Sequence, residues 1–329
     1  MADMRRTLKV IHFASQLCGI SQFGSFLRNG GYEEPVLCGK YLLYGIILFI
    51  SISVMRLQVL IGQFRESTNL SSAGHRVHIH ILVSVRACVL TTYLVSAITR
   101  LIGQRNFFKI SRKLLSVGSF MNYREGTVFS NAVIVLHVVL FVTHLIVHFL
   151  SWASNNCQLY LLHNFISNLV CDTVTSFAGL QFLYFVFTLR RNFVLLNSRL
   201  NEVVMSTVKS EGILSLKVRT VSDFLPERYS VISGVRDILY RHVILCDILE
   251  LINSSYSLQV LALIGSKFVY ATISFYLLFF SIFFPSLFLV LPAALFIPLG
   301  SFEVIQLVTV VCCCESASFQ VSVTLKTWH

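Results

Sequence analysis

Long apolar runs separated by short polar segments are the main pattern of this 329-residue chain. A bilayer core of about 30 Å requires about 20 mostly apolar residues per helix. The fifth and sixth runs form one 60-residue stretch, 252–311, whose only charges are Lys267 and Glu303, and Pro285 predicts the break between them. The pattern predicts an all-α, polytopic membrane helix bundle with six spans, at about 41–61, 78–99, 129–152, 162–189, 252–284 and 286–311.

The composition excludes a soluble fold. Hydrophobic residues make up 55% of the chain and charged residues only 12%, whereas a soluble protein carries about 25% charged residues. No GxSxG, P-loop or HExxH motif stands in a loop. We therefore predict that the protein is not an enzyme and needs no cofactor. The nine cysteines form no CxxC pair, which disfavours a zinc or disulfide scaffold.

The distribution of basic residues predicts the orientation. The N-terminal tail 1–40, the second loop, the long fourth loop 190–251 and the C-terminus together hold 21 of the 26 lysines and arginines, while the opposite side holds only Arg65 and Arg76. Basic residues concentrate on the cytoplasmic side of membrane proteins. We expect a single transmembrane domain, 1–329, with these segments in the cytoplasm.

The same orientation accounts for two further features. The net charge of +11 is explained by topology and by attraction to anionic lipid, so no nucleic-acid partner is predicted. The sequence Asn69-Leu70-Ser71 is a glycosylation sequon in the first loop, which this topology places outside the cell. Asn69 is therefore a candidate glycosylation site.

The fourth loop contains apolar residues at helical spacing, from Phe224 to Leu239. This spacing predicts a helical loop. Its nine basic residues are also compatible with an amphipathic helix lying on the inner leaflet.

Residues around the fourth loop resemble the insect gustatory receptors. The similarity lies in 182–200, with Arg190, Phe193 and Asn197 followed by Leu200, in 242–276, and in Val311-Cys312 with Glu315. The resemblance implies a receptor subunit in the plasma membrane of chemosensory neurons. It also implies a small tastant bound between helices in the outer half of the membrane, a gated cation channel, and a homo- or hetero-tetramer with other gustatory receptor subunits, in which the cytoplasmic helices form an anchor between subunits.

One part of the family's pattern is missing. The family signature, Thr-Tyr followed by five hydrophobic residues and Gln-Phe, belongs to a seventh span and does not occur in this sequence. We expect this chain to lack the seventh span, which lines the pore in the family, and channel function to be impaired for that reason.

Charged side chains inside the predicted spans are candidates for a functional site, because each costs about 2.5–3.5 kcal/mol to insert. Besides Glu303, these are Arg56, Arg86, Asp172 and Lys267. We expect Arg86, Asp172 and Lys267 to surround an outward-open ligand pocket with one ion pair among them. The alternatives are snorkelling side chains or a purely structural pair.

Two other clusters, one of histidines and one of cysteines, are weaker candidates for a functional site. His137, His144 and His148 share one stripe of the third span, but a metal centre would need a second ligand set on a facing helix, so we predict interhelical hydrogen bonds and no metal. Cys312, Cys313 and Cys314 stand at the predicted cytoplasmic end of the sixth span. They are candidates for palmitoylation, or for ordinary apolar packing.

A small-molecule transporter is the alternative function. Six spans with buried charges suit a transporter, and inverted repeats would support it. The first three and the last three spans match in neither length nor charge, and the long fourth loop also argues against two symmetric halves.

Overall fold

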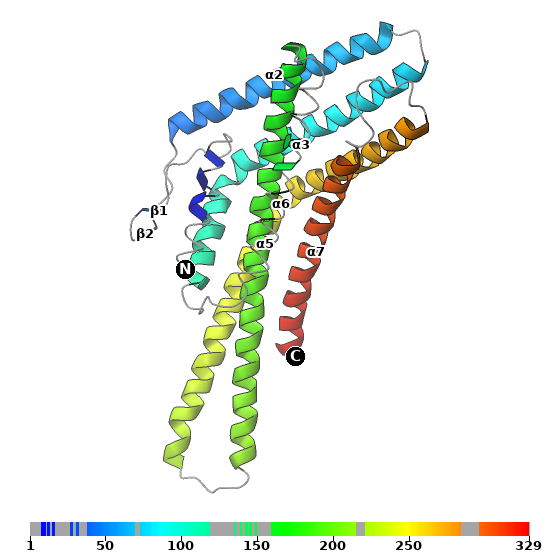
Figure 1. The fold of residues 1–329 in the computed structure, drawn as a ribbon. Coiled ribbons are helices and arrows are strands. Elements are labelled where there is room, and N and C mark those ends of the chain that lie inside the picture. Colours follow the sequence, from blue (N-terminus) through cyan, green and yellow to red (C-terminus); the bar gives the residue numbers. More distant parts are fainter. Residues whose placement is uncertain are drawn as a thin grey trace.

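The computed structural model is a bundle of long helices (Figure 1). The structure describes residues 8–10, 12–13, 15–16, 27–28, 31–32, 38–69, 73–118, 135, 139, 142–143, 145–146, 149, 159–214, 221–283 and 296–328. The helices whose first and last residues are both described are α2 (Gly39–Asn69), α3 (Ala73–Gly118), α5 (Leu159–Leu214), α6 (Val221–Phe283) and α7 (Phe296–Trp328). Two-residue strands, β1 (Leu27–Arg28) and β2 (Gly31–Tyr32), pair antiparallel near the N-terminus. The predicted all-α membrane bundle is confirmed.

Four helices in the described part of the chain are long and apolar enough to cross a membrane, and α3 carries a shorter apolar segment, Val83–Thr99. The first, second, fourth and fifth predicted spans fall on these segments. The third predicted span, 129–152, lies outside the described residues except for scattered positions. The candidate segments are Gly39–Gly62, Ile166–Met205, Ile232–Phe279 and Gly300–Val323.

Several helix ends lie on the side that the predicted topology requires. Toward the upper side of Figure 1 lie the end of α2, the start of α5, the end of α6 and the start of α7. Toward the lower side lie the end of α3, the end of α5, the start of α6, and the C-terminus. In the predicted orientation the upper side is extracellular and the lower side cytoplasmic.

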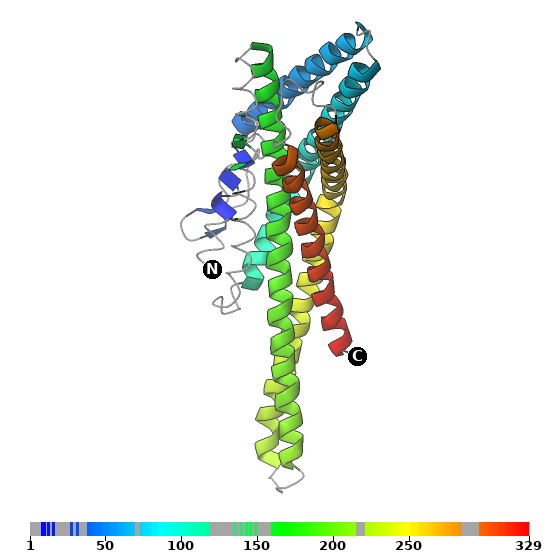
Figure 2. The same cartoon turned by 45° about the vertical axis from the view of Figure 1, so that its right-hand side comes forward.

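The two longest helices extend well beyond a membrane. Helix α5 has 56 residues and α6 has 63, and at a rise of about 1.5 Å per residue each is more than twice as long as a bilayer core of about 30 Å. Both views show α6 running back beside α5, with the shorter α7 alongside them (Figure 1 and Figure 2). The predicted helical fourth loop is thus confirmed over the described parts of 190–251, as continuous extensions of α5 and α6.

The main core lies where these extensions meet α3 and α7. Large apolar side chains from four helices pack there, including Phe107 of α3, Phe185 and Phe193 of α5, and Tyr256 of α6. A smaller apolar cluster, with Ile52, Val85, Val89, Tyr93, Cys171 and Val174, joins α2, α3 and α5 nearer the upper side. The residues of α5 that carry the family resemblance, 182–200, therefore belong to the main core.

The apolar helix at the sixth predicted span continues beyond the predicted C-terminal end. It was expected at 286–311, whereas the apolar segment of α7 continues to Val323, because Glu315 is the only charge between Glu303 and Lys326. Pro298 is the third residue of α7 and so lies in its first turn. A proline in the first turn removes no helical hydrogen bond, since amides there have no partner within the helix. Pro285 and Pro292 lie outside the described residues.

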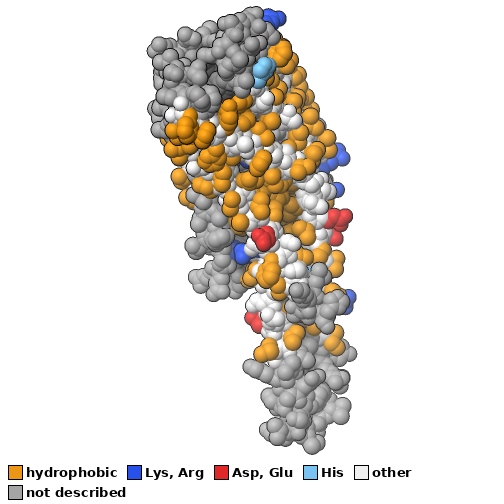
Figure 3. Space-filling view, turned by 90° about the vertical axis from the view of Figure 1, so that its right-hand side faces the viewer, with side chains coloured by type: hydrophobic (Ala, Val, Ile, Leu, Met, Phe, Trp, Pro, Cys, Tyr) orange, Lys and Arg blue, Asp and Glu red, His pale blue; other side chains and the backbone are white. Residues whose placement is uncertain are grey.

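The surface agrees with a membrane setting. Figure 3 shows hydrophobic side chains covering the upper half of one face, while most of its Lys, Arg, Asp and Glu side chains appear lower down. On α6, Phe268, Phe275, Phe279 and Phe283 are all exposed. Apolar surface of this extent suits contact with lipid tails.

Candidate functional site

A buried ion pair joins α6 and α7 inside the spans. Lys267 Nζ lies 2.7 Å from Glu303 Oε2, and only 8% of Lys267 and 2% of Glu303 are exposed. Lys267 Nζ also lies 5.3 Å from the centroid of the Phe302 ring, within the range of a cation–π contact. The pair neutralises two charges that would otherwise be costly in the membrane.

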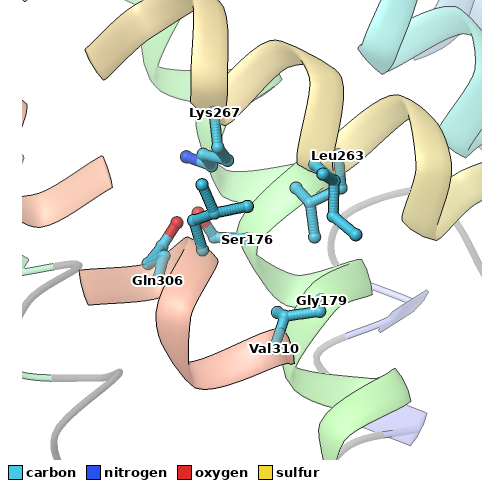
Figure 4. Close-up of a pocket in the computed structure, with 8 residues that line it drawn as sticks. Ser176, Gly179, Leu263, Lys267, Gln306 and Val310 are labelled. Atoms are coloured by element: carbon cyan, nitrogen blue, oxygen red, sulfur yellow. The ribbon is translucent and has the colours of Figure 1, made fainter. Parts of the chain in front are cut away.

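Lys267 also lines a small pocket between α5, α6 and α7. Ser176 of α5 and Gln306 of α7 supply its other polar groups, and Figure 4 shows both on the same side of the pocket as the lysine. The pocket has room for roughly one water molecule. The remaining lining is Gly179, Leu263, Ile264, Leu307 and Val310.

Two glycines allow the helices around this pocket to approach closely. A Cβ atom on Gly179 of α5 would lie 3.2 Å from Leu263 Cδ2 of α6. A Cβ atom on Gly300 of α7 would lie 3.2 Å from Ser274 Cβ of α6. Small residues at such crossings are the usual means by which membrane helices pack tightly, and here they bring Glu303 within reach of Lys267.

A second cluster of charges surrounds Tyr270, one turn of α6 beyond Lys267. The Tyr270 hydroxyl lies within electrostatic reach of Asp172 and Arg56, of Glu303, and of Arg86. Arg56 and Asp172 also act on the Cys171 thiol. The ion pair and the second cluster therefore form one polar zone that draws on α2, α3, α5, α6 and α7.

The three predicted pocket residues occupy different places in this zone. Lys267 lines the pocket and is paired with Glu303. Arg86 and Asp172 are half-buried and belong to the cluster around Tyr270, outside the lining of the pocket. A ligand pocket shared by all three stays a prediction.

Glu303 was not among the predicted pocket residues, although the sequence contains a signal for it. Lys267 and Glu303 are the only charges in 252–311 and have opposite signs. Because consecutive spans are usually neighbours, two lone opposite charges in them are natural partners. Tyr270 gave no such signal, since nothing distinguishes it from the other 11 tyrosines of the chain.

The modification candidates are separated by the fold. Cys312 is exposed, Cys313 is buried in the main core and Cys314 is half-buried. Cys313 lies within electrostatic reach of Arg190, which follows the predicted inner end of the fourth span, so the three cysteines lie near that level. Asn69 is the last residue of α2, before the predicted outer loop.

The described residues contain no group of three or more His, Cys, Asp and Glu side chains that could hold a metal ion. His137, His144 and His148 of the third predicted span lie outside the described residues.

Comparison with known proteins completes this picture. A family model described as 7tm Chemosensory receptor matches residues 8–327, nearly the whole chain. No curated protein matches the sequence. The family comprises receptors rather than enzymes, and its many membrane-spanning helices agree with the fold described above. This multi-pass membrane protein therefore belongs to the 7tm chemosensory receptor family.

Proposed function

We propose that the chain is a gustatory receptor subunit in which a small tastant binds between the helices. The observation that carries this proposal is the polar zone formed by the Lys267–Glu303 pair and the cluster around Tyr270. Buried charges inside membrane helices usually mark ligand or ion sites. A tastant with higher affinity for the open state would shift the closed-to-open equilibrium of a cation pore.

The proposal extends to the setting of the protein. The whole chain, 1–329, acts as one transmembrane receptor domain in the plasma membrane of chemosensory neurons and assembles as a homo- or hetero-tetramer with other gustatory receptor subunits. The signature of the family's seventh span does not occur in these residues. Sequencing the 3′ end of the transcript tests whether a segment with that signature follows these residues.

Recording currents from cells tests the function. The chain is expressed alone and together with other gustatory receptor subunits, and a tastant panel is applied during whole-cell recording. We expect a tastant-evoked cation current that falls strongly when Arg86, Asp172 and Lys267 are all changed to alanine. Surface biotinylation must accompany the recordings, because the triple variant also removes structural contacts.

The control uses an exposed ion pair on the predicted cytoplasmic side. Lys113 Nζ lies 3.0 Å from Asp247 Oδ2 across α3 and α6, and Lys113→Ala leaves the polar zone untouched. An unchanged current in the triple variant at equal surface expression would refute the proposed site. Uphill substrate uptake without any current would favour a transporter instead.

A further inference from the structure

Arg56 of α2 is a buried cation to which the described residues offer no oxygen acceptor. Its exposed fraction is 0%, and among the residues that the structure describes Nε, Nη1 and Nη2 all lack an oxygen acceptor. The Cys171 thiol lies within hydrogen-bonding reach of the guanidinium, but a thiol is only a weak, uncharged acceptor. A guanidinium held in this way is costly unless an anion pairs with it.

The charges of the zone do not cancel. Its described members are three cations, Arg56, Arg86 and Lys267, and two anions, Asp172 and Glu303. Lys267 and Glu303 neutralise each other at 2.7 Å. One positive charge therefore remains in excess, and the bare guanidinium of Arg56 places it on α2.

The surroundings of Arg56 suit an organic ligand. Around it the helices bring together Tyr270 of α6, Cys171 of α5, and the apolar cluster containing Tyr93. Arg86 and Asp172 are only half-buried, so the zone is not sealed. An organic anion bound here would pair its charge with the Arg56 guanidinium and pack its apolar part against aromatic and aliphatic side chains.

We propose that the tastant site reaches Arg56 and takes an organic acid, whose carboxylate accepts hydrogen bonds from the guanidinium. The planar guanidinium presents paired donors that match the two oxygens of a carboxylate. This inference rests on the proposed function, because it names the ligand class for the same polar zone.

Thermal stability of the purified full-length chain tests the inference without any need for current. The probes are sodium acetate, butyrate and benzoate, each compared with its neutral amide and with sodium chloride at equal ionic strength. We expect at least one carboxylate to raise the unfolding temperature with a saturable dependence on concentration, and the matched amide and chloride to have no comparable effect.

Variants at Arg56 then locate the site. In Arg56→Gln the carboxylate should bind at least about tenfold more weakly, because bonds to a charged group are lost, whereas Lys113→Gln should bind normally. If Arg56→Gln does not fold, the wild-type comparison of acid with amide still decides between a charged and a neutral ligand. Arg56→Lys then locates the site. Because lysine keeps the positive charge, this variant should bind the carboxylate more weakly than the wild type but more tightly than a variant without that charge.

Four results would overturn the inference: no stabilisation by any of the three acids, equal stabilisation by an amide, equal stabilisation by chloride, or full binding in the Arg56 variants. The two proposals fail separately. Saturable acid binding without a tastant-evoked current would refute the receptor channel and support the acid site. A current evoked only by neutral compounds would support the receptor channel and refute the acid site.

Discussion

Lys267 of α6 and Glu303 of α7 form an ion pair of 2.7 Å within the membrane-spanning part of the bundle. Both side chains are buried, and each is the only charge of its predicted span. The pair thus fixes the register of α6 against α7 at the depth of the small pocket. Removing one partner leaves the other charge buried and unpaired.

Glu303→Gln should destabilise the protein strongly. Breaking a buried pair from one side costs about 3–5 kcal/mol, so we expect lower surface expression and a lower unfolding temperature in detergent. The double variant Lys267→Glu with Glu303→Lys should recover part of the loss, because it restores one charge of each sign at the same two positions. Fluorescence-detected size-exclusion chromatography after heating measures both.

Lys113→Gln is the matched control for Glu303→Gln. It breaks the Lys113–Asp247 pair, whose side chains are 38% and 53% exposed. Exposed pairs contribute at most about 1 kcal/mol, so this variant should unfold close to the wild-type temperature. Equal decreases in unfolding temperature in the two variants would mean that the buried Lys267–Glu303 pair contributes no more to stability than the exposed pair.

Most of the helical framework could be predicted from the sequence, because membrane spans are set by hydrophobic length and charge. The predicted helix in 190–251 and the end of the fifth span near Pro285 agree with α5 and α6. The apolar part of α7 continues past the predicted far end of the sixth span to Val323, since the lone Glu315 does not stop an apolar helix that packs against α5. Asn197 Nδ2 donates to Gln320 O at 3.3 Å in that packing, a contact that no local pattern reveals.

The site was less predictable than the framework. Hydrophobic patterns predict which charges lie inside spans, and three of these, Arg56, Lys267 and Glu303, are buried in the bundle. These patterns do not give the rotation of one helix about its axis relative to another. That rotation decides that Lys267 faces Glu303, and that Asp172 lies near Tyr270.

Gly300→Ala should loosen the contact between α6 and α7. The added Cβ would lie 3.2 Å from Ser274 Cβ and 3.6 Å from Phe275 Cζ, so the helices must move apart at a cost of about 1–3 kcal/mol. Gly265→Ala is the control, because no atom lies within 4 Å of its added Cβ. Adding Ser274→Gly to Gly300→Ala should recover stability. Unfolding temperatures that fall equally for both glycines would contradict the close approach.

The exposure of the three cysteines predicts where an acyl chain attaches if the protein is palmitoylated. Cys312 is exposed whereas Cys313 is buried among α5 and α7 side chains. Acyl exchange on protein from cells should therefore lose most of its signal in Cys312→Ser and little in Cys313→Ser. A signal that depends on Cys313 alone would show that the end of α7 opens in the cell.

Epitope tags test the orientation on which the proposed outer ligand site depends. A tag placed between residues 70 and 72, after α2, should bind antibody on intact cells. A tag placed between 215 and 220, after α5 and before α6, should bind antibody only after permeabilisation, because the segments predicted on that side hold 21 of the 26 basic residues. Asn69→Gln adds an independent check, since loss of an endoglycosidase-sensitive band would place Asn69 outside. Staining of the second tag on intact cells would invert the bundle and put the Lys267–Glu303 zone in the opposite half of the membrane.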